Sequence, residues 1–165
     1  MTATYEKIAT TTLGSDTGSV TLSSIPSTYT DLVFIMNGSD TGSVQLGIQF
    51  NSDTGNNYSM TNITGNGSLA RSYRGEIYNL IQFGYDAYLD SGFNYNNIIN
   101  IQNYSNTTTY KTLIGRANNG NTGVTATVGL WRSTSAITSM TLLQSYGSTS
   151  FKTGSTFTLY GIKAE

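Results

Sequence analysis

The fold class is decided by a short stretch, Val44-Gln-Leu-Gly-Ile-Gln-Phe50, in which apolar and polar residues alternate. Because successive side chains of a β-strand point to opposite faces, this period of two predicts a half-buried antiparallel strand. Residues 123–132 alternate in the same way, with one side made of Val124, Ala126, Val128 and Leu130 and the other of Thr125, Thr127, Gly129 and Trp131. The apolar, even-numbered side is therefore predicted to face the core.

Strand patterns continue along the chain on both sides of these stretches. Residues 31–36, Asp-Leu-Val-Phe-Ile-Met, are apolar on both faces, which predicts the most central strand. Further strands are expected at residues 4–12, 19–25, 57–63, 76–83, 96–104, 109–116, 137–144 and 155–163, separated by turns rich in Gly and Asn. This pattern predicts one all-β domain over residues 1–165. The expected architecture is a jelly-roll-like antiparallel β-sandwich of about 8–10 strands.

Composition excludes many functional classes. The chain has 165 residues, of which 81 are Thr, Ser, Gly or Asn, and it has neither Cys nor His. Disulfides, thiolate nucleophiles, Cys/His zinc sites and triads with an imidazole base are therefore excluded, and no cofactor, metal site or catalytic residue is predicted. We expect a protein without enzymatic activity.

Charge and hydropathy also limit the expected partners. Eight basic and nine acidic residues are scattered along the chain and form no basic stripe, so we expect no nucleic-acid partner. No apolar run approaches the roughly 20 residues of a membrane helix, and the first residues lack the apolar region of a signal peptide. We therefore expect no membrane partner and synthesis in the cytoplasm.

One motif is repeated within the chain. The sequence Gly14-Ser-Asp-Thr-Gly-Ser-Val20 recurs as Gly38-Ser-Asp-Thr-Gly-Ser-Val44, and Ser52-Asp-Thr-Gly55 is a shorter third copy. We interpret the copies as one hairpin turn used more than once, in which Asp accepts local backbone hydrogen bonds and Gly adopts a positive φ. Aspartic proteases also use Asp-Thr-Gly, but there the Asp directly follows an apolar strand and is rigidly held. Here Gly-Ser or Asn-Ser precedes each copy, which argues against a protease.

The segment from Phe83 to Gly92 is predicted to form a long aromatic loop that contains Tyr85 and Tyr88. It also holds two acids, Asp86 and Asp90, which are the most suggestive pair for glycosidase chemistry, since that chemistry needs two carboxylates about 5–9 Å apart. A solvated loop whose acids keep it soluble is the favoured interpretation.

Trp131 is the third candidate residue. By alternation it lies opposite the predicted core face, so it could cap a second hydrophobic layer, pack on a neighbouring subunit or form a platform for a sugar ring. The candidate interface or ligand surface predicted from sequence therefore consists of Tyr85, Tyr88 and Trp131.

Six segments carry a resemblance to a known group of proteins. They are Thr4-Tyr-Glu-Lys-Ile-Ala9, Ser24 to Val33, Phe50 to Gly55 with Asn57-Tyr-Ser59, Gln102 to Thr112, Gly129-Leu-Trp-Arg-Ser133 and Gly154 to Lys163. With these segments the chain resembles small virion proteins of tailed bacteriophages, particularly those of marine bacteria and cyanobacteria. The stretch matched least is residues 65–95, which includes the aromatic loop.

The resemblance implies a structural component of the virion. The expected role is a capsid-surface decoration or cement protein, bound to the major capsid protein or another virion protein and forming a homotrimer. The trimer is expected by analogy, because capsid lattices offer threefold positions. The alternative is a binding module of a tail fibre or head fibre that recognises host surface glycans.

Overall fold

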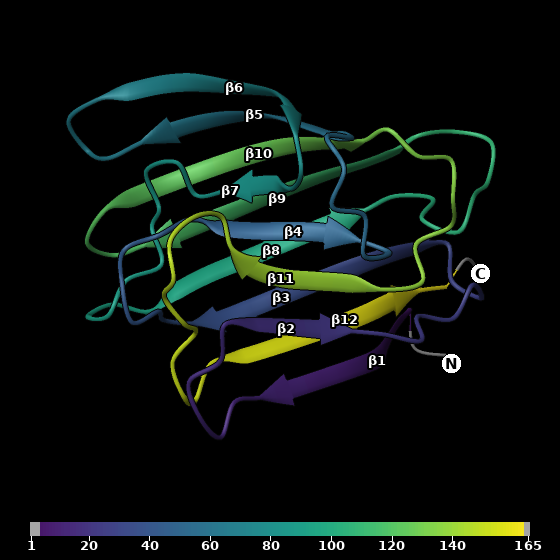
Figure 1. The fold of residues 1–165 in the computed structure, drawn as a ribbon, viewed down its shortest axis with the longest axis horizontal. Coiled ribbons are helices and arrows are strands. Elements are labelled where there is room, and N and C mark those ends of the chain that lie inside the picture. The colour runs from purple at the N-terminus through teal and green to yellow at the C-terminus, as the bar shows by residue number, and fades with distance from the viewer. Residues whose placement is uncertain (1–3, 164–165) are drawn as a thin grey trace.

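The structure, a computed structural model, describes residues 4–163, so residues 1–3 and 164–165 of the domain predicted over residues 1–165 lie outside the described residues. Two antiparallel sheets are stacked face to face (Figure 1). The eight-stranded sheet has the order β1 (Tyr5–Thr12), β12 (Thr156–Ile162), β3 (Asp31–Gly38), β8 (Tyr95–Ile101), β9 (Lys111–Asn119), β10 (Gly123–Trp131), β5 (Tyr58–Gly65) and β6 (Ala70–Tyr78). The four-stranded sheet has the order β2 (Ser19–Leu22), β11 (Met140–Gln144), β4 (Leu46–Phe50) and β7 (Ile81–Phe83).

The predicted fold class, an all-β antiparallel sandwich, is confirmed, although the described residues form twelve strands rather than eight to ten. The chain crosses between the two sheets repeatedly, as expected for jelly-roll-like connections, and the core lies between them. Inward-facing side chains that are completely buried include Leu32, Phe34, Met36, Ile48, Phe83, Tyr95, Ile99, Met140, Phe157 and Leu159. The last strand is held between β1 and β3, as the alternation of Phe157 and Leu159 with polar residues predicts.

The predicted core face of β10 is wrong. Val124 and Val128 are 58% and 53% exposed, whereas Thr127, Gly129 and Trp131 are buried. The inner side tolerates Thr because its hydroxyls have partners: Thr127 Oγ1 donates a hydrogen bond to Asn62 Oδ1 at 2.5 Å. Gly129 is required by close packing, since a Cβ there would lie 2.8 Å from Ile81 Cδ1.

Two further strand predictions need correction. β4 is buried on both faces rather than half-buried, because Gln49 donates to the Asn79 carbonyl and Gln45 accepts from Gln82. β3 is not the most central strand, since β8 and β9 occupy the middle of the sheet, and its Ile35 is 39% exposed.

The repeated motif does not form hairpins. Residues 14–18 connect β1 to β2 and residues 39–45 connect β3 to β4, so both copies cross from one sheet to the other. Asp40 and Asp53 accept hydrogen bonds from the N–H two residues later, at 3.0 and 2.9 Å, as predicted. Gly18, Gly42 and Gly55 are absent from the described residues with positive φ, so that part of the prediction is wrong. The two long copies instead pair with either side of the β11–β12 connection, through Thr17 and Asp40 opposite Phe151.

Candidate functional site

Trp131 belongs to the core. Its side chain is 2% exposed, stacks on the Tyr58 ring with centroids 6.3 Å apart and packs against Phe50 at 5.5 Å. The indole Nε1 donates to Asp53 Oδ2 at 2.7 Å. Burial alone raises the pKa of the Asp53 carboxyl, but hydrogen bonds from Trp131, Asn57 and the Gly55 N–H outweigh burial and hold that pKa below its ordinary value. The prediction that Trp131 lies opposite the core is wrong, and Trp131 cannot present a surface to a partner or sugar while the core is intact.

Tyr85 lies in the connection from β7 to β8 and is half-buried. Side chains of the edge strand β6 hold it in place. Its ring stacks on Tyr73 with centroids 4.6 Å apart, and the Arg71 guanidinium lies 5.1 Å from its centroid. A hydrogen bond between the Tyr73 and Tyr78 hydroxyls, together with burial, raises the pKa of Tyr73 to about 12. Tyr85 is therefore fixed by intramolecular stacking.

Tyr88 is also half-buried and is tied to the turn that precedes β10. Its backbone N–H donates to Thr122 Oγ1 at 3.1 Å, and its carbonyl accepts from Asn119 Nδ2 at 2.7 Å. Trp131 lies at the far end of β10, about 25 Å away by strand rise. The three aromatic residues predicted from sequence are therefore not brought together.

The carboxylates of Asp86 and Asp90 in the loop both accept hydrogen bonds from residues of the same chain. Asp86 is buried, forms an ion pair with Arg71 and accepts a hydrogen bond from Thr64. The Arg71 guanidinium holds the pKa of the Asp86 carboxyl below its ordinary value, although burial opposes this shift. Asp90 accepts from the N–H groups of Gly92 and Phe93. Because a general acid needs a raised pKa, Asp86 is poorly suited to the protonating role in glycosidase chemistry.

The buried Asp40 likewise has a structural environment. Its Oδ1 accepts from the Gly42 N–H and its Oδ2 accepts from Gln144 Nε2 at 2.8 Å. Asp16 is exposed and accepts from the Thr153 N–H at 2.9 Å. No group of three or more acidic side chains that could hold a metal ion is found among residues 4–163.

The feature that distinguishes the molecule is the outer face, by which we mean the side of the eight-stranded sheet turned away from the four-stranded sheet. It carries one row of facing side chains across five strands, namely Ile35, Ile98, Arg116, Ala126 and Ile63. A second row contains Asn100, Ile114, Val128 and Thr61, and a third contains Asn37, Asn96, Asn118 and Val124. Five of these apolar side chains, Ile35, Ile63, Ile114, Val124 and Val128, are between 39% and 66% exposed.

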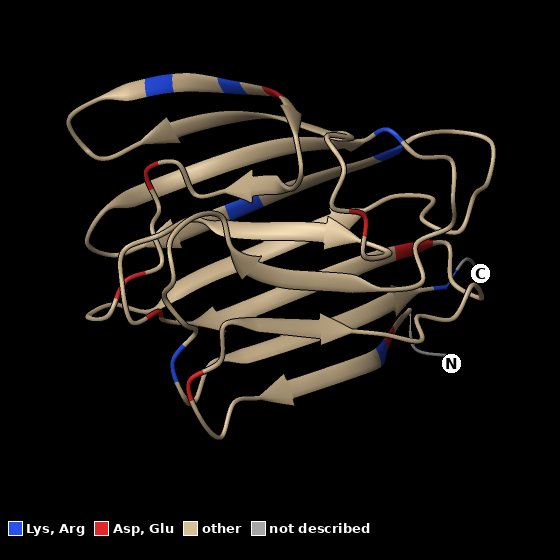
Figure 2. Ribbon diagram, in the orientation of Figure 1, with Lys and Arg blue, Asp and Glu red and all other residues tan. Residues whose placement is uncertain are grey.

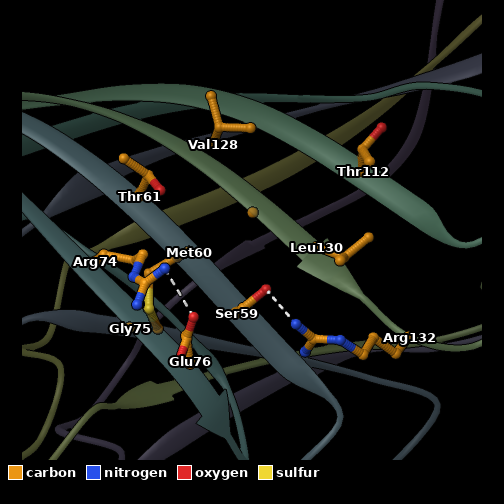
Figure 3. A pocket seen from close by; sticks show the side chains of 11 residues that line it. Ser59, Met60, Thr61, Arg74, Gly75, Glu76, Thr112, Val128, Leu130 and Arg132 are labelled. Carbon is orange, nitrogen blue, oxygen red and sulfur yellow. Dashed lines mark hydrogen bonds and ion pairs between the residues drawn. The ribbon is translucent and has the colours of Figure 1, made fainter.

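Shallow hollows join these rows into one continuous surface. Three of them, of about 290, 570 and 300 Å³, share Arg116 as a lining residue. Another, of about 290 Å³, lies over β5, β6 and β10 and is shown in Figure 3. There the Arg132 guanidinium points to Ser59 Oγ and Arg74 points to Glu76, with Val128 and Leu130 between β5 and β9.

Most of the described acidic residues lie in the connections between strands (Figure 2). Asp16, Asp40, Asp53, Asp86 and Asp90 all lie in connections, and each accepts a hydrogen bond from a residue of the same chain. Arg116 stands in the middle of the outer face and is exposed. Its side chain has no hydrogen-bond or ion-pair partner among the described residues 4–163.

Sequence reasoning missed this surface because it assigned Val124, Ala126 and Val128 to the core. One signal could have located it. The odd-numbered side of β10 ends in Trp131, and Trp is highly buried on average in folded proteins. The exposed Ile and Val side chains are then explained by their preference for β-strands, on a face that no other element covers.

Comparison with known proteins does not identify a family. No family model and no curated protein matches the chain. Solved structures similar to it include a sucrose-6-phosphate hydrolase from Lactobacillus gasseri, 11% identical with a TM-score of 0.36, of which the match covers 28%, and 90% of this chain. An alginate lyase from Aplysia kurodai is 9% identical with a TM-score of 0.36, over 83% of this chain and 72% of the lyase. A tetrameric galectin from the sponge Cinachyrella is 10% identical with a TM-score of 0.34, over 87% of this chain and 99% of the galectin.

Residues 4–163 contain no helix that is long and apolar enough to cross a membrane.

Proposed function

We propose that the chain is a non-enzymatic structural protein of a tailed-phage particle, and that it attaches to another virion protein through the outer face. The observation that carries the attachment is the gathering of Ile35, Ile63, Ile114, Val124 and Val128, all exposed, on one side of one sheet. The assembly that we propose, a phage particle, is taken from the resemblance of the sequence to small virion proteins.

Exposure of this apolar surface to water costs free energy. Each apolar side chain left exposed forgoes about 25 cal/mol per Å² that burial would return. Scattered exposed apolar residues need no explanation, but a contiguous apolar patch on a folded monomer marks a contact site. On the outer face these residues occupy neighbouring positions, since Ala126 pairs with Ile63 and Ile114 pairs with Val128. The surface therefore has the composition of an interface core.

Within the particle, the proposed role is that of a decoration or cement protein on the capsid, with the major capsid protein as the proposed partner. A trimer suits the threefold positions of a capsid lattice. The outer strands β1 and β6 each have one unpaired edge among the described strands, so copies could contact one another there while the outer face contacts the capsid.

A second candidate function is that of a fibre module that binds a host glycan. One observation favours it: the hollow lined by Asn96, Asn118 and Arg116 has Ile35 and Ile98 beside these polar groups. Amide and guanidinium groups that converge next to apolar side chains are the usual composition of a small-ligand site.

The two functions are separated by locating the protein. A density map of particles from the encoding phage is expected to show the protein on the capsid shell, with its outer face turned toward the capsid. Density at a fibre tip, together with binding of the purified protein to host polysaccharide, would support the fibre module instead. Absence from purified particles would contradict both.

A further inference from the structure

The chemistry of the partner surface can be inferred from Arg116. This residue pairs in register with Ile98 on β8 and Ala126 on β10, so its guanidinium stands among the apolar side chains of its own row, with Asn100 and Asn118 on the neighbouring rows. Three hollows converge on it, and it has no carboxylate partner among the described residues. We propose that the outer face docks against an acidic and apolar protein surface that places a carboxylate opposite Arg116; this inference rests on the proposed function.

Desolvation requires the carboxylate. A partner that covers the outer face also removes water from Arg116, because the guanidinium stands among the apolar side chains that the contact buries. A buried charge without a counter-charge costs far more than the surrounding apolar contacts return. Arg is suited to such a position because its planar fork binds a carboxylate through two parallel hydrogen bonds. Binding of an apolar partner without an acid would be disfavoured, because the contact would bury the charge of Arg116 without a counter-charge.

A second copy docked outer face to outer face does not supply an unpaired acid. Among the described residues, the strands of the eight-stranded sheet hold three acids, and each is already engaged. Glu6 pairs with Lys163 at 2.7 Å, Glu76 pairs with Arg74 at 2.8 Å, and Asp31 accepts from the Asn103 N–H at 2.7 Å. Two outer faces brought together would place the Arg116 charges of both copies in one contact without an unpaired acid from these strands. Charge complementarity therefore favours a different, acidic partner.

An anionic polysaccharide would also present carboxylates, but the surroundings of Arg116 favour a protein. The described residues that line its three hollows include Ile35, Ile63, Ile98 and Ile114, together with Asn96, Asn100 and Asn118, and no aromatic side chain. Sugar rings are usually held by stacking on aromatic faces, whereas branched aliphatic rows pack well against aliphatic side chains of another protein.

The test uses a displayed library of random peptides, selected on the immobilised full-length protein. The selected peptides are expected to contain Asp or Glu flanked by Leu, Ile or Val. Their affinity is expected to fall at least about tenfold for Arg116→Gln and to fall less for Arg116→Lys, which keeps the charge but loses the fork. The affinity for the native protein should weaken as salt is raised, and that dependence should be smaller for Arg116→Gln.

Lys152→Gln is the matched control, because Lys152 lies in the β11–β12 connection, away from the outer face. Its peptide affinities should equal those of the native protein. Peptides without acids, or affinities unchanged by Arg116→Gln, would overturn the inference. So would binding of polygalacturonate that Arg116→Gln abolishes, or sedimentation of the native protein as an oligomer that outer-face substitutions dissociate. None of these readouts involves the phage particle, so failure here is distinct from absence of the protein from virions.

Discussion

Trp131 fixes one end of β10 through both its ring and its indole N–H. The ring fills the space between Tyr58 and Phe50, and the N–H holds the carboxylate of Asp53 at 2.7 Å. Asp53 in turn caps its own turn by accepting the Gly55 N–H. One side chain thus links the last core layer to the connection between β4 and β5.

Replacing Trp131 tests this role directly. Trp131→Ala is expected to lower the free energy of unfolding by about 3–5 kcal/mol, the usual cost of removing a large buried aromatic. Trp131→Phe keeps most of the packing but leaves Asp53 without the indole donor, and should cost about 1–3 kcal/mol. Urea titration followed by circular dichroism measures both. A Trp131→Ala protein with an unchanged urea midpoint would show that the ring is not part of the core.

The Asp86–Arg71 pair predicts an acid-sensitive stability. Because the pKa of Asp86 is lower in the folded protein than in the unfolded chain, the unfolded state binds the proton more readily. The contribution is therefore complete above the unfolded pKa of about 4 and is lost as pH falls through the lower, folded pKa.

We expect Arg71→Gln to be less stable than the native protein at pH 7 and to lose less stability between pH 5 and pH 2. Arg74→Gln is the matched control, since Arg74 is on the same strand but its pair with Glu76 is exposed. Equal pH dependence in the native protein and Arg71→Gln would contradict the assignment.

At the scale of elements, β10 shows why hydropathy alternation can point to the wrong face. Its more apolar side is exposed because the inner side is filled by Trp131 and by Thr residues whose hydroxyls find partners, and Gly129 leaves room for Ile81. Hydropathy ranks Val above Thr and Gly, but burial depends on the fit of the whole layer.

A pair of substitutions on neighbouring strands tests this assignment. Val128→Thr should change the free energy of unfolding by less than about 0.5 kcal/mol, because Val128 is 53% exposed. Leu113→Ala on β9, where the side chain is 3% exposed, should cost about 2–5 kcal/mol. Chemical denaturation measures both, and a large loss for Val128→Thr with none for Leu113→Ala would restore the predicted orientation.

Most strands were predictable from sequence because period-two alternation marks an extended segment, even where, as in β10, it points to the wrong face. β6 was not, because Ala70–Tyr78 is an edge strand in which Gly75 alone is buried, so it has no alternation to detect. The predicted strand at residues 76–83 joined the end of β6 to β7, although these strands belong to different sheets. The sequence pattern did not show this break, which comes just after Ile77, a non-Gly residue with a φ of 58°.

The candidate surface was less predictable than the fold. Tyr85 and Tyr88 were selected for their aromatic character, yet stacking and hydrogen bonds to Tyr73, Arg71 and Asn119 hold them half-buried. Those partners are distant in sequence, so no local pattern reports them. The outer face was missed for a related reason: an exposed row of apolar residues and a buried one have the same pattern in the sequence.

In the molecule as a whole, the two layers of the sandwich differ in charge and exposure. The four-stranded sheet and the connections, which carry five of the described acids, complete the core and the turns. The eight-stranded sheet leaves one broad face uncovered, with its apolar rows and Arg116 turned outward. We expect this face to be the surface through which the protein attaches to its partner.

The most direct test is attachment of an outer-face variant to particles that lack the native protein. In the double variant Ile114→Gln and Val128→Gln, two facing apolar side chains become polar without any change of charge, so the apolar contact is tested separately from Arg116. Phe93→Gln is the control, because Phe93 is 49% exposed but lies in the β7–β8 connection. We predict a loss of attachment of at least about tenfold for the double variant, the scale of interface hot spots, with an unchanged urea midpoint and normal attachment of the control. Native attachment by the folded double variant would contradict the account.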